Sequence, residues 1–176
     1  RRVTWKEYEL IEPTPKTSYR REITWGVFNE KANRFANLLL QRGVKKGDKV
    51  AILMMNGLEW LPIYFGILKT GALAVPLNFR YSSDEIEYCV NLAEVDILVF
   101  SNPFIGRVEE IADRISKGRL LIYVGEGCPS FADDYNSLSA NCSSQSPMVA
   151  LTDEDYAAIY FSSGTTGFPK AILHKH

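Results

Sequence analysis

The feature that most constrains the fold of this sequence is a regular alternation of short apolar runs with longer helical patterns. Apolar runs of strand length occur at 49–55 (KVAILMM), 73–77 (LAVPL), 96–100 (DILVF) and 120–124 (LLIYV). Such runs are typical of strands that are covered on both faces of a parallel sheet. Because helical patterns separate them, the sequence predicts an α/β fold: a mostly parallel sheet with helices on both faces, joined by right-handed crossovers.

The helical patterns carry start and stop signals. Thr24 is placed to cap a helix that begins at Trp25, and Gly43 supplies a stop at its C-terminus. Three further helices are predicted, over residues 59–70, 82–93 and 105–116. Ser82 and Glu85 have the i, i+3 spacing of a capping box at the start of one of them. Each of the three helices after residue 55 falls between two predicted strands, as βαβ units require.

Changes in composition divide the chain into parts. We expect residues 1–22 to form an irregular lead and residues 23–176 to form one α/β unit. Within this unit, 125–152 is rich in glycine, serine, asparagine and proline, which predicts an irregular surface connection with a short helix around 131–138. The strand predicted at 156–161 leads from this connection into a glycine-rich segment.

The charges and apolar runs exclude some classes of function. Lysine and arginine total 20, aspartate and glutamate total 21, and the formal net charge is −1. This balance predicts no nucleic-acid-binding surface and no polybasic membrane patch. The longest apolar run ends before Lys69 and is shorter than the ~20 residues of a membrane-spanning helix. No apolar signal core follows Arg1-Arg2, so we expect no secretory signal.

The cysteines predict neither a zinc site nor a disulfide framework. Cys89, Cys128 and Cys142 are too few and too far apart for a zinc motif, and three cysteines cannot all pair. Cys89 lies in a predicted helix, where a small buried thiol is expected. Free thiols fit a reducing compartment, so we expect a cytoplasmic protein.

The segment with chemical character follows the strand predicted at 156–161. It consists of Ser162, Ser163, Gly164, Thr165, Thr166, Gly167, Phe168, Pro169 and Lys170. Its two glycines let backbone N–H groups turn toward phosphate oxygens. Its four hydroxyls add donors, and a hydroxyl is also able to coordinate a magnesium ion that bridges phosphates. Lys170 offers a charge-assisted contact to a departing pyrophosphate. The composition predicts a phosphate-binding loop, and the alternative is a plain surface turn between two strands.

This segment does not have the pattern of a Walker A loop. Lys170 lies six residues after Gly164, but the second glycine is at Gly167 and not directly before the lysine, and no Ser or Thr follows. The exit, 171–173 (AIL), is typical of a strand, whereas a helix follows a Walker A loop. The sequence therefore disfavours a P-loop NTPase.

Residues 159–170 (IYFSSGTTGFPK) resemble the signature of the adenylate-forming, or AMP-binding, superfamily, which includes acyl-CoA synthetases, peptide-synthetase adenylation domains and luciferases. The likeness extends over residues 23–176, through segments 24–38, 43–52, 64–72 and 75–78. It is greatest to the N-terminal part of acyl-CoA synthetases and fatty-acid–CoA ligases. The resemblance implies the N-terminal portion of the large domain of such an enzyme.

In this superfamily a carboxylate attacks the α-phosphorus of Mg-ATP, which gives an acyl-adenylate and pyrophosphate; in the CoA ligases a thiol then takes the acyl group. The resemblance implies ATP, Mg²⁺ and CoA as ligands, together with a small carboxylic acid. The residues that match the loop holding the β- and γ-phosphates are Ser162, Ser163, Gly164, Thr165, Thr166, Gly167 and Lys170, with Lys170 stabilising pyrophosphate. His176 matches a histidine that often follows this loop, and His174 has no assigned role. No side chain is assigned as a metal ligand.

Members of this superfamily are much longer than 176 residues. The aspartate that holds the ribose, the hinge and the C-terminal lysine have no match in this chain. We therefore expect an N-terminal piece that is inactive without the C-terminal part of the same enzyme. Two alternatives to a CoA ligase are open: an amino-acid or aryl-acid adenylating domain of a peptide synthetase, and a non-catalytic nucleotide-binding or interaction module.

Overall fold

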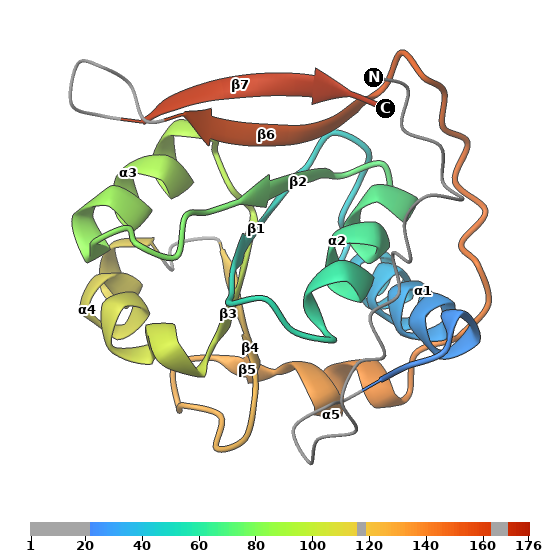
Figure 1. The fold of residues 1–176 in the computed structure, drawn as a ribbon, viewed down its shortest axis with the longest axis horizontal. Coiled ribbons are helices and arrows are strands. Elements are labelled where there is room, and N and C mark those ends of the chain that lie inside the picture. Colours follow the sequence, from blue (N-terminus) through green and yellow to red (C-terminus); the bar gives the residue numbers. More distant parts are fainter. Residues whose placement is uncertain (1–21, 116–118, 163–168) are drawn as a thin grey trace, which may run out of the picture.

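One central sheet organises the chain (Figure 1). The computed structural model describes residues 22–115, 119–162 and 169–176. The strands are β1 (Lys49–Leu53), β2 (Leu73–Pro76), β3 (Ile97–Ser101), β4 (Leu120–Val124), β5 (Asp133–Asp134), β6 (Tyr156–Ser162) and β7 (Lys170–Lys175). The helices are α1 (Trp25–Gln41), α2 (Trp60–Lys69), α3 (Ser83–Leu92), α4 (Ile105–Ile115) and α5 (Tyr135–Ala140), with a 3-10 turn at Asn102–Phe104.

The strand order confirms the predicted mostly parallel sheet. It runs β5-β4-β3-β1-β2-β6-β7. All neighbouring pairs from β5 to β6 are parallel, and β7 alone runs antiparallel, beside β6. After β2 the chain crosses to the other side of β1, and after β5 it returns to pair β6 with β2.

Helices cover both faces of the sheet, as the continuous apolar runs predict (Figure 1). Because side chains alternate along a strand, Val50 and Ile52 face α1, α2 and α5, whereas Ala51 and Leu53 face α3 and α4. Each face has its own apolar cluster, and these strand residues are at most 1% exposed. The sheet is thus packed between two layers of helices, with a separate apolar core on each of its faces.

The predicted caps form. The hydroxyl of Thr24 accepts a hydrogen bond from the backbone N–H of Val27 at 3.2 Å, and α1 begins at the next residue after Thr24. Ser82 and Glu85 make both hydrogen bonds of a capping box at the start of α3. Gly43 has a φ of +85°, which a residue with a side chain rarely adopts, so glycine fits this turn after α1.

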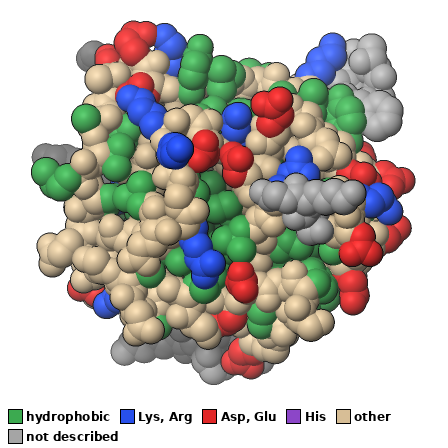
Figure 2. All heavy atoms as spheres, turned by 180° about the vertical axis from the view of Figure 1, so that it is seen from behind, with side chains coloured by type: hydrophobic (Ala, Val, Ile, Leu, Met, Phe, Trp, Pro, Cys, Tyr) green, Lys and Arg blue, Asp and Glu red, His purple; other side chains and the backbone are tan. Residues whose placement is uncertain are grey.

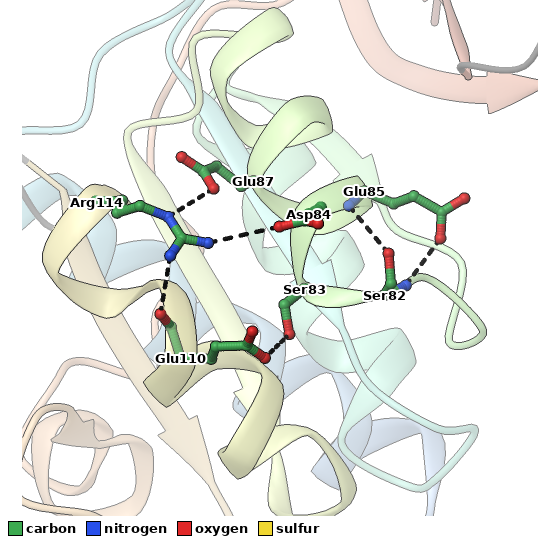
Figure 3. Close-up of polar contacts among 7 residues, drawn as sticks. All are labelled: Ser82, Ser83, Asp84, Glu85, Glu87, Glu110 and Arg114. Atoms are coloured by element: carbon green, nitrogen blue, oxygen red, sulfur yellow. Dashed lines mark hydrogen bonds and ion pairs between the residues drawn. The ribbon is translucent and has the colours of Figure 1, made fainter.

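Polar contacts join α3 to α4 at the surface of their layer (Figure 3). Arg114 of α4 donates to Glu87 of α3 at 2.8 Å and lies 3.6 Å from Asp84. The Ser83 hydroxyl donates to Glu110 of α4. These exposed ion pairs contribute little each, so the apolar contacts beneath them provide most of the stability of this layer.

The connection at 125–152 is more ordered than its composition suggests. It contains β5 and the helix α5, which begins at Tyr135, four residues later than the predicted start at 131. Asp134 caps α5 by accepting from the backbone N–H of Ser137 at 2.7 Å. Phe131 instead stacks on Phe100, with ring centroids 5.9 Å apart.

Three polar side chains on α1 fasten the end of this connection. Asn33, Arg34 and Asn37 all donate to backbone carbonyls in residues 140–145. The five bonds run from Asn33 to Ser144 (2.7 Å), from Arg34 to Ala140 and Cys142 (2.9 and 2.5 Å), and from Asn37 to Ser143 and Gln145 (2.8 and 2.9 Å). They satisfy carbonyls at the end of α5 and in the segment after it, which the sequence did not predict.

Replacing Arg34 with alanine is therefore expected to loosen the segment 140–145. Amide hydrogen exchange there should become about tenfold faster, because a hydrogen bond to a charged donor contributes about 1.5 kcal/mol. Exchange measured by mass spectrometry tests this. Arg42→Ala, which removes an exposed guanidinium just after the same helix, is the matched control; equal exchange in the two variants would contradict the prediction.

The remaining sequence expectations concern thiols, charge and membranes. Cys89 is fully buried, and burial raises the pKa of its thiol to about 12, so it is an inert core thiol as predicted.

On the face drawn in Figure 2, lysines and arginines are interspersed with aspartates and glutamates. Among the described residues, no helix is long and apolar enough to cross a membrane, and no cluster of His, Cys, Asp and Glu is arranged to hold a metal.

Candidate functional site

Two residues of the predicted phosphate-binding segment face each other across a hairpin. Ser162 ends β6 and Lys170 begins β7, and they are register partners in the antiparallel pair. Pro169, between the loop and β7, is buried. The other predicted site residues, Ser163, Gly164, Thr165, Thr166 and Gly167, lie outside the described residues.

The hairpin confirms that the segment is not a Walker A loop. A strand enters it and a strand leaves it, so Lys170 lies in β7 and not at the start of a helix. The segment after Lys170 therefore offers no helix N-terminus, which is the element that holds phosphate in a Walker A loop.

The segment leaves the sheet at its carboxyl edge. Since β6 runs parallel to β1, β2, β3 and β4, the end of β6 at Ser162 lies at the same edge as the ends of those strands. Ligands of open α/β sheets bind outside this edge. A crevice of about 300 Å³ lies at this edge, lined by Met54, Met55, Gly57, Glu59, Ser101, Val124, Gly125, Glu126 and Asn136.

A larger hollow, of about 450 Å³, lies at the opposite edge of the sheet, between residues that include Asp48, Asp96 and Arg119. The side chains of Asp48, Asp96 and Arg119 already make hydrogen bonds within the fold. Asp48 accepts from the backbone of Lys45 at 2.7 Å, and Asp96 accepts from the backbone of Lys49 at 2.8 Å. Arg119 donates to the carbonyls of two neighbouring segments. We therefore place the candidate site at the carboxyl edge, although the hollow there is smaller.

The charge of Lys170 is available for a ligand. Its side chain is exposed, and within the described residues it forms no ion pair. Lys175, on the same strand, is paired with Glu154. An unneutralised ammonium at the mouth of a hairpin is suited to an anionic ligand.

A second ion pair fixes the start of β6. Lys46 donates to Asp155 at 2.7 Å, and Asp155 also accepts from the backbone of Thr152 at 2.8 Å. The hydrogen bond from Lys46 is the main reason why the pKa of Asp155 lies below its usual value. These contacts hold the strand that leads into the site, and the pairing of Lys46 with Asp155 over 109 residues has no local signal in the sequence.

The two histidines have structural contacts. His174 meets the ring of Tyr160 edge-on, with centroids 5.0 Å apart. The backbone N–H of His176 donates to the carbonyl of Asp155 at 3.1 Å. Tyr160 is also hydrogen-bonded to Tyr64 of α2, hydroxyl to hydroxyl, at 2.8 Å. The sequence analysis did not identify either tyrosine as a residue near the site. Tyr160 could have been identified, because residues two apart in a strand share one face and Tyr160 precedes Ser162 by two.

The hairpin lies at the carboxyl edge of a mostly parallel sheet, which is the edge where open α/β proteins bind their ligands. Comparison with known proteins defines the class. The family described as AMP-binding enzyme matches residues 10–176. This chain belongs to the AMP-binding enzyme family.

Its relatives include named CoA ligases. It is 32% identical over 162 residues to a medium/long-chain-fatty-acid–CoA/3-oxocholest-4-en-26-oate–CoA ligase of Mycolicibacterium smegmatis, with 88% of this chain and 29% of that protein covered. It is 34% identical over 161 residues to a crotonobetaine/carnitine–CoA ligase of Salmonella paratyphi B, with 89% and 31% covered. The chain thus spans about 30% of the length of the relatives it matches.

Solved structures that are similar to this chain include adenylate-forming CoA ligases. The anthranilate CoA ligase AuaEII, in complex with anthranoyl-AMP, superposes with a TM-score of 0.84 at 30% identity, over 89% of this chain and 30% of that one. ATP-bound MatB from Rhodopseudomonas palustris gives a TM-score of 0.76 at 28% identity, over 90% of this chain and 31% of that one. The fold of residues 22–176, in its described parts, is that of the N-terminal region of adenylate-forming CoA ligases.

Proposed function

We propose that the protein to which this chain belongs is an AMP-forming acid–CoA ligase. It activates a small carboxylic acid with Mg-ATP, releases pyrophosphate and transfers the acyl group to CoA. The observation that carries the proposal is Lys170, which forms no ion pair within the described residues and lies opposite Ser162 at the mouth of a hairpin, in a chain of the AMP-binding enzyme family.

In this proposal the motif acts by position and charge. Lys170 and Ser162 face each other where the loop joins β6 and β7. The ammonium of Lys170 and the hydroxyl of Ser162 can therefore contact opposite sides of one phosphate chain. The amides and hydroxyls of Ser163, Gly164, Thr165, Thr166 and Gly167 complete the phosphate site. Mg²⁺ would neutralise phosphate charge when it enters with ATP, and Lys170 would stabilise the charge that develops on pyrophosphate.

The proposal extends to domain organisation. Residues 23–176 are the first part of the AMP-binding domain, behind the lead predicted at 1–22, and the cytoplasm is the expected compartment. We expect the 176 residues by themselves not to complete adenylation, because they span about 30% of the length of the relatives named as CoA ligases. The acid is open: relatives are named for fatty acids, carnitine and anthranilate.

ATP–pyrophosphate exchange tests the proposal. The full-length protein is assayed with a panel of fatty, short-chain and aryl carboxylic acids, and then with CoA as acceptor. We expect exchange with at least one acid and formation of its CoA thioester, and no exchange by residues 1–176 alone. Exchange without thioester formation would favour a peptide-synthetase type adenylating domain. No exchange with any acid would favour a non-catalytic binding module.

A further inference from the structure

Two tyrosine hydroxyls connect helix α2 to strand β6 just before the phosphate-binding segment. The hydroxyl oxygens of Tyr64 and Tyr160 lie 2.8 Å apart and share a hydrogen bond. Tyr160 precedes Ser162 by two residues, so both side chains lie on the face of β6 that is turned to α1 and α2. Since His174 of β7 packs edge-on against the Tyr160 ring, Tyr160 contacts α2 and the returning strand of the hairpin together.

This contact lies where β6 has weak backbone support from its parallel neighbour β2. The parallel register of β2 and β6 is set by Ala74 opposite Ala158. Continued by two residues, it places Pro76, the last residue of β2, level with Tyr160. Proline has no N–H, so it cannot donate a ladder hydrogen bond at this level. The side-chain bond from Tyr64 holds β6 where β2 lacks a donor.

Tyr64 is itself held firmly. Its ring stacks on Trp60, with centroids 5.4 Å apart and planes 11° apart, and meets Phe65 edge-on at 5.9 Å. Burial is the main reason why the pKa of Tyr64 is raised, and the hydrogen bond with Tyr160 raises it further. The hydroxyl of Tyr64 therefore stays protonated at neutral pH.

We propose that Tyr64 is a positioning residue for ATP: through Tyr160 it fixes the place of Ser162 and Lys170 at the carboxyl edge of the sheet. The inference rests on the proposed function. Ser162 and Lys170 are partners across the hairpin, so a displacement of β6 moves both groups away from the phosphates together. Loss of the hydroxyl pair weakens ATP binding and leaves recognition of the acid and of CoA unchanged.

Tyr64→Phe in the full-length enzyme tests the inference, because it removes one hydroxyl and keeps the ring that stacks on Trp60. We expect the apparent KM for ATP to rise about fivefold, the factor expected for one hydrogen bond. The KM for the acid should change by less than about twofold, because the inference gives the two tyrosines no contact with the acid. Tyr160→Phe should have the same effect, and the double variant no larger one, because the two hydroxyls act as a unit.

Tyr123→Phe is the matched control. It removes a tyrosine hydroxyl that donates to the carbonyl of Glu126 at 2.9 Å, on β4, which three strands separate from β6. It should lower the melting temperature and leave the KM for ATP unchanged. The inference is overturned if Tyr64→Phe leaves the KM for ATP unchanged, if its effect adds to that of Tyr160→Phe, or if Tyr123→Phe raises this KM equally. Failure of the proposed function is distinguishable, because the unsubstituted enzyme would then show no exchange with any acid.

Discussion

Replacing Lys170 with alanine in the full-length enzyme is expected to lower the rate of ATP–pyrophosphate exchange about a hundredfold, the usual effect of removing one group that stabilises charge in a transition state. The side chain is exposed and forms no ion pair within the described residues, so its loss leaves no carboxylate unpaired. Folding should therefore be unaffected. Because negative charge grows on pyrophosphate as the bond to the α-phosphorus breaks, the reduction should fall on kcat more than on the KM for the acid.

Lys175→Ala is the matched control for this experiment. It removes the same charge from the same strand, but Lys175 is already neutralised by Glu154. Its exchange rate should stay within about twofold of the unsubstituted enzyme, as is usual for an exposed ion pair. Equal rates for Lys170→Ala and the unsubstituted enzyme would remove Lys170 from the mechanism, and equal losses in both variants would indicate a general effect of surface charge.

Gly66→Val is expected to destabilise the fold by about 3 kcal/mol, which is the upper range for overpacking a core. Gly66 lies on α2, where α2 packs against α1 (Figure 1). A Cβ atom at this position would lie 2.9 Å from the carbonyl oxygen of Ala32 and 3.0 Å from the ring of Phe35. Because Ala32 contributes a backbone atom, the clash cannot be relieved by a side-chain rotation, and the two helices have to separate.

Urea-induced unfolding of the chain measures this effect, and Gly106→Val is its matched control. Gly106 also lies in a helix, α4, but outside the backbone of its own helix no described atom is within 4 Å of the position that its Cβ would take. The control should change the free energy of unfolding by less than about 0.5 kcal/mol, as surface substitutions usually do. A similar loss in both variants would show that helix propensity, and not the α1–α2 contact, decides the outcome.

Most of the secondary structure could be predicted because its causes are local. The apolar run 49–55 forms β1 over residues 49–53, and the hydroxyl of Thr24 caps α1 three residues away from its donor. The helix predicted around 131–138 was less accurate. Phe131 is drawn into the core against Phe100, so the helix begins only after the cap at Asp134. Where a distant apolar partner competes with local propensity, the tertiary contact wins.

The sequence by itself determined the alternation of strands and helices, the apolar stripes that become two cores, and the chemistry of the segment that ends at Lys170. These depend on neighbours within a few residues, whose spacing sets which side chains share a face. Only the tertiary structure decided that β6 lies beside β2, that α1 fastens residues 140–145, and that Tyr64 meets Tyr160 from 96 residues away. Such contacts depend on how the long crossovers return to the sheet, and no local pattern encodes which distant segments the crossovers bring together.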